Sequence, residues 1–349
     1  MSKNVYFWHK NKRESKIKEY DDNISKPEVT RDLYRRWRDA RQQWDTEARD
    51  AVDFVLGNHY TSDESNALQA VGQADFVIDR VYAAVDKLKS LLTAQPAKFS
   101  AIGREDSDNK LSNVWKVILE YIWDISKGDS VFKQVVHDYA VQGLGYMYVY
   151  LDPEADYGRG EIKYTHIDPF RVYVDPASRD RFFSDASGMI LSTFLTRQQV
   201  IDLYPEIEEM IDDISTGDNS LYGDDYPTSN RKNSQNVLTP AEAKDLDYSN
   251  TEKFQILDRF YKVKVPYYRL FNTSQGGEKI IDAETYEQVI QQPENIQAIE
   301  NGDVEVEEVM QTRIMQCSSI GDILLYERVL NTDIYPIVPF ANIWTNTPY

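Results

Sequence analysis

The sequence has one cysteine, Cys317, among its 349 residues. A lone thiol excludes an internal disulfide and a multi-cysteine metal site, and this scarcity favours a reducing compartment. Long apolar runs are missing too, because no stretch approaches the roughly 18 residues that indicate a membrane-spanning helix. The first residues contain no apolar segment followed by small residues, so we expect no secretory signal.

Recognisable catalytic motifs are also absent. There is no G-x-x-x-x-G-K-[ST] loop for nucleotide phosphates and no G-x-S-x-G nucleophile turn. The four histidines do not stand at metal-binding spacings: His9, His59, His137 and His166. Cys317 lies in a strand-like run without a candidate base. The sequence therefore predicts a protein that is not an enzyme and has no cofactor.

Negative charge predominates, with 58 Asp and Glu residues against 39 Lys and Arg, a net charge of −19. The imbalance is uneven: residues 1–50 hold 13 basic and 10 acidic residues, which leaves −22 for the remaining 299. So acidic a body is a poor candidate for tight nucleic-acid binding, which depends on neutralising phosphates. It suits a surface past which nucleic acid slides without sticking, although solubility is the simpler explanation.

Helical patterns dominate residues 28–142, after a polar segment at 1–27 that we expect to be a flexible arm. Apolar residues recur at three- and four-residue steps from Pro27 to Leu56 and predict one long helix. Further helices are predicted at 76–93, 108–126 and 130–142.

Arginines gather on the polar face of the first of these helices, at Arg35, Arg36, Arg38 and Arg41. A solvated helix face is the simplest interpretation of this pattern. A contact with nucleic acid or with an acidic partner is the alternative.

A β-framework with a short helix is predicted over residues 143–210. Gly143 and Gly145 stand between a helix and a strand, the reverse of the order in a dinucleotide-binding fingerprint, so we expect a helix cap and a tight turn. Three Asp-Pro pairs, Asp152-Pro153, Asp168-Pro169 and Asp175-Pro176, mark turns between strands. Proline fixes φ there, and the aspartate side chain bonds the turn backbone.

Four aspartates follow one another in this framework, at Asp168, Asp175, Asp180 and Asp185. Carboxylate oxygens are suitable ligands for Mg²⁺ and Ca²⁺, which makes the series a weak candidate for a metal site. The tight register and sharp glycine turn of a calcium loop are missing. Turn and cap chemistry is the favoured interpretation, and no bound metal is expected.

Residues 211–252 lose apolar periodicity and are predicted to be a polar surface loop or a disordered insertion. Strand patterns return over 253–349, with a short helix at 283–291. The fold class is therefore α+β, with N-terminal helices followed by a mixed β-rich region that contains short helices.

Several segments together resemble the portal proteins, or head-tail connectors, of tailed phages, most closely those of short-tailed phages (podoviruses). They include A-V-D-F-V-L-G-N-H-Y at 51–60, the apolar helix at 76–92, the helix and strand at 131–149, the double Asp-Pro segment, and Y-P-I-V-P-F-A-N at 335–342. Each segment alone is weakly specific. Their order and spacing across most of the chain carry the resemblance.

The resemblance implies a structural subunit of a dodecameric ring around a channel through which double-stranded DNA is packaged and ejected. The implied partners are terminase, tail adaptors and the major capsid or scaffolding proteins, without a membrane. It places the chain at the portal vertex of the virion, after assembly in the host cytoplasm. In this family, the counterpart of 335–342 leads into stem, clip and crown parts, which we expect to be absent here, leaving the outer, wing-like part.

Two other functions stay open at this point. A metal-dependent nuclease or nucleotidyltransferase would use the carboxylates between Asp168 and Asp185, since two-metal chemistry needs converging carboxylates. A capsid-associated or tail adaptor protein would share the virion setting, but we expect it to be smaller.

Overall fold

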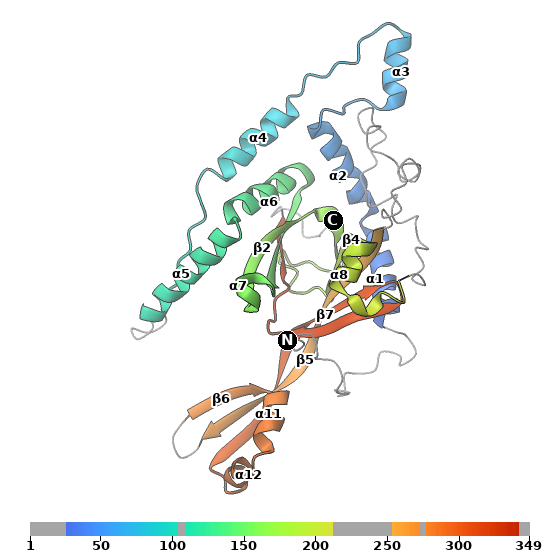
Figure 1. The fold of residues 1–349 in the computed structure, drawn as a ribbon. Helices are drawn as coiled ribbons and strands as arrows, with labels where there is room; N and C mark the ends of the chain where they lie inside the picture. Colours follow the sequence, from blue (N-terminus) through green and yellow to red (C-terminus); the bar gives the residue numbers. More distant parts are fainter. Residues whose placement is uncertain (1–25, 104–108, 212–252, 273–276, 342–349) are drawn as a thin grey trace.

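The computed structural model describes residues 26–103, 109–211, 253–272 and 277–341. Figure 1 shows helices in the first part of the chain and antiparallel sheets in the remainder, which confirms the α+β class. The flexible arm expected at 1–27 and the polar loop expected at 211–252 lie outside the described residues, apart from their edges.

The first helical segment is broken at Arg41 into α1 (Lys26–Ala40) and α2 (Gln42–Val55). The prediction of one continuous helix is therefore wrong at this residue, whose backbone has φ −100° and ψ 5°. The Arg41 side chain at this break is directed into the protein, as described below. Ion pairs of Lys26 with Glu327 and of Arg31 with Asp322 hold α1 against the sheet, both at 2.6 Å.

The next helices are α3 (Ser62–Ala70), α4 (Val81–Leu92), α5 (Asn109–Ile125) and α6 (Gly128–Gln142). The sequence patterns missed α3, which begins with a capping box between Thr61 and Glu64. They also began α4 five residues too early. The Asp79 carboxylate accepts the Tyr82 N–H at 2.8 Å, a polar start signal that outweighed the apolar pattern before it.

A three-stranded antiparallel sheet is built from β1 (Leu144–Asp152), β2 (Glu161–Ile167) and β9 (Ile337–Ala341), in the order β2-β1-β9. Its register places Gly145 opposite Phe340 and Tyr146 opposite Ile167. The last described strand therefore pairs with the first, which closes the fold around one central region.

The larger sheet has the order β3-β4-β5-β7-β8, with β6 paired to the far end of β5. Its strands are β3 (Val172–Val174), β4 (Gly188–Thr196), β5 (Lys253–Asn272), β6 (Gly277–Asp282), β7 (Val304–Ile320) and β8 (Ile323–Leu330). β5 continues through Pro266, which faces Met310 in an uninterrupted register. The far halves of β5 and β7 project from the body as a long hairpin (Figure 1).

The tip of this hairpin carries β6 and two short helices, α11 (Ala283–Ile290) and α12 (Pro293–Glu300). The first was expected, and the second was not. Four further short elements connect the strands: α7 (Ala155–Gly158), η2 (Pro169–Arg171), α8 (Arg197–Leu203) and η3 (Pro205–Ile207). A capping box of Thr196 and Gln199 opens α8, the short helix that was expected within residues 143–210.

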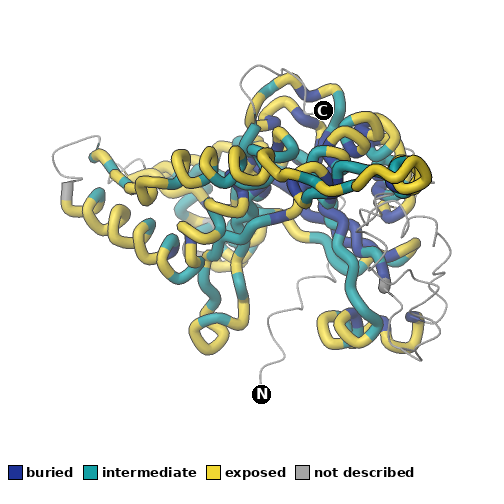
Figure 2. The backbone as a smooth tube through the Cα atoms, turned by 90° about the horizontal axis from the view of Figure 1, so that it is seen from above, coloured by how far each residue is buried: buried dark blue, intermediate teal, exposed yellow. Residues whose placement is uncertain are grey.

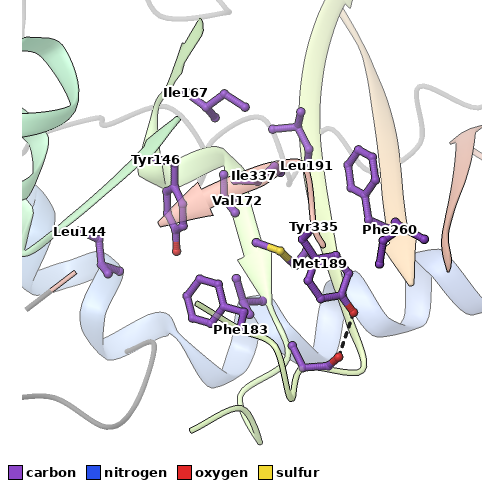
Figure 3. Packing of buried hydrophobic residues seen from close by; sticks show 13 residues of the cluster. Leu144, Tyr146, Ile167, Val172, Phe183, Met189, Leu191, Phe260, Tyr335 and Ile337 are labelled. Carbon is purple, nitrogen blue, oxygen red and sulfur yellow. Dashed lines mark hydrogen bonds between the residues drawn. The ribbon is translucent and has the colours of Figure 1, made fainter. Parts of the chain in front are cut away.

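The main core lies where the two sheets face each other, and Figure 3 shows its packing. Tyr146, Val172 and Met189 are fully buried there. The Tyr335 hydroxyl donates to the Ala186 carbonyl at 2.8 Å, which ties the segment before β9 to the turn before β4. Figure 2 shows that burial is concentrated at this centre, while the outlying helices are mostly exposed.

Candidate functional site

Arg41 stands at the junction between α1 and α2, and only 1% of it is exposed. Its guanidinium group donates to three main-chain carbonyls at the Asp-Pro turn: Phe170 at 2.6 Å, Val172 at 2.5 Å and Pro169 at 3.2 Å. The same group forms an ion pair with Asp45 at 3.1 Å. One side chain therefore fixes both helices to the turn between β2 and β3.

Burying a charge is costly unless hydrogen-bond acceptors and an opposite charge surround it. The planar guanidinium of Arg41 presents several donors in a fixed fork, so it serves three carbonyls and a carboxylate together. Our prediction that Arg41 lies on a solvated face and is available to nucleic acid is corrected by this burial. A signal existed in the sequence, because Arg41 follows Trp37 by four residues and precedes Ala48 by seven, on the apolar stripe itself.

The other three arginines of the predicted basic face do lie at the surface of α1. Arg35 and Arg36 are exposed, and Arg38 is half-buried with its guanidinium 3.5 Å from the Asp39 carboxylate. The structure therefore brings together Arg35, Arg36 and Arg38 on one helix, and separates Arg41 from them.

The Asp-Pro pairs form turns of the kind that the sequence predicts. The Asp168 carboxylate accepts the Phe170 N–H at 3.0 Å, and burial raises the pKa of this carboxyl group. The Asp175 carboxylate accepts the Ala177 N–H at 2.9 Å and the Ser187 hydroxyl at 2.5 Å. Burial opposes ionisation of Asp175, but these hydrogen bonds outweigh it and lower its pKa.

Asp180 and Asp185 organise the loop that follows. The Asp180 carboxylate accepts the Ser184 N–H at 2.9 Å. The Asp185 carboxylate accepts the Ser178 hydroxyl at 2.5 Å and the Arg179 N–H at 2.7 Å. Hydrogen bonds to the charged form, chiefly from Ser178, lower the pKa of Asp185 to about 2.

These four aspartates do not converge on a common point. Across the part of the chain that the structure describes, no group of three or more His, Cys, Asp or Glu residues is placed to hold a metal ion. Each carboxylate of the series, from Asp168 to Asp185, instead accepts hydrogen bonds from its own turn.

The two glycines between α6 and β1 have different roles. Gly143 ends α6 in the left-handed region at φ 78°, where glycine is favoured, and acts as the helix cap. Gly145 does not form the expected tight turn, since it lies within β1. A Cβ at this residue would fall inside contact distance of the Val135 carbonyl oxygen, so glycine is required because α6 crosses β1 closely.

A polar contact that the sequence did not reveal joins α6 to β2. Asp138 on α6 meets the Nε2 atom of His166 on β2, and both side chains are largely buried. His166 comes two residues before Asp168, so this pair lies next to the Asp-Pro turn whose carbonyls Arg41 binds. The contact spans 28 residues of sequence, and no local pattern could indicate it.

Exposed apolar side chains gather on α4, α5 and the segments beside them, which we call the apolar arm (described residues between 76 and 121). The arm leaves fourteen large apolar side chains exposed. Ile102 is 90% exposed, Phe76 71% and Trp115 53%. Figures 1 and 2 show the arm on one flank of the molecule, largely exposed along its length.

A chain of this kind has the character of an assembly subunit, because its polar clusters hold turns in place and an apolar surface is left exposed. The family model described as Phage P22-like portal protein matches residues 31–347. The chain therefore belongs to the family of P22-like phage portal proteins. Comparison with curated proteins gives no match.

Membership of this family implies a structural role at the portal vertex of a phage capsid, in an oligomeric ring. The family is generally non-enzymatic. None of the described helices is long and apolar enough to cross a membrane.

Proposed function

We propose that this chain is a ring subunit that forms the conduit for DNA packaging and ejection at the portal vertex. The ring is a dodecamer around a central channel, and it serves as the docking platform for terminase and tail adaptors. The match of the family model over residues 31–347 carries this proposal. The action is mechanical and electrostatic, without catalysis, cofactor or metal.

The charge distribution supports the proposal. Outside residues 1–50 the chain has a net charge of −22, so a ring of copies is strongly negative as a whole. Repulsion between such a ring and the phosphates disfavours adhesion of the double helix and does not depend on its sequence. In this function the DNA passes through without sequence-specific binding.

The basic face of α1 is the exception to this acidic surface. Arg35, Arg36 and Arg38 provide the contact with DNA near the ring or with an acidic partner, and Arg41 takes no part because it is buried. The major capsid or scaffolding proteins complete the set of partners. Assembly takes place in the host cytoplasm, and the finished ring resides in the virion.

Native mass spectrometry of the assembled particle, with negative-stain imaging, tests the proposal. We expect a closed ring of identical subunits with a central hole. A chain that stays monomeric at concentrations where portal rings assemble overturns it. A melting temperature raised by Mg²⁺ would instead support the nuclease alternative, since a metal that binds only the folded state stabilises it.

A further inference from the structure

The sequence of α5 is patterned for burial along its whole length, but only its C-terminal part is buried within the chain. Leu111, Trp115, Ile118 and Ile122 stand three or four residues apart and form one stripe on the helix. Ile122 is 9% exposed, whereas Leu111 is 56% and Trp115 is 53% exposed. The C-terminal part of the stripe is therefore covered by the described chain, and its N-terminal part is exposed.

At the C-terminal end of α5, the aromatic side chain of the covered part has specific contacts within the chain. The Trp123 ring packs edge-on against Phe99, with ring centroids 5.4 Å apart. The Trp123 indole N–H donates to Asp129 at 3.0 Å. No comparable contact is described for Trp115, although it lies on the same helix two turns earlier.

The exposed area of the arm matches what a specific interface needs. Its fourteen partly exposed apolar side chains would together remove on the order of 800 Å² from water if they were covered. A standard protein interface buries about the same area on each partner. Several hundred Å² of exposed apolar surface gathered in one region of a protein indicates an interaction site.

The charge of the arm indicates which molecule covers it. Residues 76–121 contain seven basic and six acidic residues, a net charge of +1 in a chain whose total is −19. Identical acidic copies repel each other over most of their surfaces. They can approach most easily through a nearly neutral, apolar surface, so the arm is suited to meet a second copy of this chain.

We infer that the apolar arm of each subunit packs against a different surface of the next copy and forms the contact that closes the ring. This inference rests on the proposed function. Figure 1 places α4 and α5 on one flank of the molecule and α8 on the other, so the arm of one copy would meet a different surface of the next copy. A repeated contact between two different surfaces generates a ring when the rotation closes.

Substitutions on the exposed part of α5 test the inference, because they leave the described core unchanged. We expect the double variant Leu111→Glu/Trp115→Glu to lose ring formation and to run as a monomer in native mass spectrometry, with an unchanged circular dichroism spectrum. Asn113→Glu is the matched control, since it adds the same charge per residue on the opposite side of the helix and should still form rings. Failure of the control to assemble would overturn the role of the apolar stripe.

The outcomes separate the inference from the proposed function. If the wild-type chain and the double variant both form rings, the inference is wrong and the portal function stands. If the wild-type chain itself stays monomeric, the proposed function is wrong. If rings form but amide exchange in α5 is as fast as in the monomer, the arm is not covered by a second copy and the inference is also overturned.

A mixing experiment tests whether the contact joins two different surfaces. The double variant keeps an intact receiving surface, so it accepts the arm of a wild-type copy but offers no arm to the next one. We expect a minor fraction of variant, mixed with wild-type monomers before assembly, to yield open oligomers in place of closed rings. Wild-type rings that form at full yield and exclude the variant would contradict the head-to-tail arrangement.

Discussion

The guanidinium carbon of Arg41 lies 3.9 Å from the centroid of the Tyr173 ring. This contact adds a cation–π interaction to the hydrogen bonds that the same group donates to the Asp-Pro turn. Tyr173 in turn packs edge-on against Tyr34 of α1, with ring centroids 4.6 Å apart. The N-terminal helices and the β-framework are therefore joined through one buried cation and two aromatic rings.

Replacement of this cation should be among the most destabilising single changes in the chain. We expect Arg41→Met to lower the free energy of unfolding by about 3–5 kcal/mol, because it leaves Asp45 and three carbonyls without their donor. Urea denaturation followed by circular dichroism measures this change. Arg36→Ala, on the exposed face of α1, should stay within about 0.5 kcal/mol of wild type. Equal effects of the two substitutions would show that the Arg41 contacts contribute no more than a surface residue does.

The crossing of α6 over β1 predicts a second effect. Gly145→Ala places a methyl group against the Val135 carbonyl oxygen, and we expect a loss of about 1–3 kcal/mol in the free energy of unfolding. Gly277→Ala is the matched control within a strand, since no atom lies within 4 Å of its added Cβ. Urea titrations of both variants make the comparison. A Gly145→Ala protein as stable as the control would mean that α6 moves away from β1 at little cost.

Asp185 predicts a dependence of stability on acid pH. Its pKa is about 2 in the folded chain, below the value of about 3.9 for an unperturbed aspartate. Between these values the unfolded chain binds more protons, so the stabilising contribution is complete above about pH 4 and is lost as the pH falls toward 2. We expect Asp185→Asn to be less stable than wild type near neutral pH and to lose less stability across that window. The measurement is the free energy of unfolding of both proteins from pH 2 to pH 7 by urea denaturation. If the two curves against pH run parallel, Asp185 is not a source of the acid sensitivity.

The basic face of α1 predicts an effect on DNA handling without an effect on folding. Arg35→Ala/Arg36→Ala should lower DNA packaging yield while the melting temperature stays unchanged, since both residues are exposed. If both arginines contact phosphates, the slope of log affinity for DNA against log salt concentration should fall by about 2. Arg159→Ala/Arg181→Ala removes the same charge far along the sequence and serves as the control. An identical loss in the control would assign the effect to net charge, not to α1.

Much of the architecture could be predicted because its signals are local. The Asp-Pro pairs, the capping box at Thr196 and the helix cap at Gly143 each involve hydrogen bonds within a few residues. Alternating apolar residues likewise gave β7 and β8. Sequence patterns therefore place mainly the elements that depend on neighbours in sequence, although α3 was missed despite its local capping box.

The features that sequence reasoning missed depend on distant neighbours. Arg41 finds its acceptors about 130 residues away, at Phe170 and Val172, so its place on the apolar stripe could indicate burial but not these partners. Gly145 is required by α6 crossing β1, which no turn pattern indicates. The apolar stripe of α5 is visible in the sequence, but a pattern of apolar residues does not specify whether its own chain or another molecule covers it.

The β5–β7 hairpin has a mechanical consequence. Its register runs unbroken from Ile256 opposite Ile320 to Asn272 opposite Val304, so it contains no bulge at which the ribbon could bend locally. At one end Ile256 and Ile320 are anchored in a buried cluster, and at the other Tyr268 stacks on Tyr286 of α11 with centroids 4.0 Å apart. The hairpin is therefore expected to be stiff, and a force applied to its tip is transmitted along β5 and β7 into the core. There it reaches the strands that pack against α1.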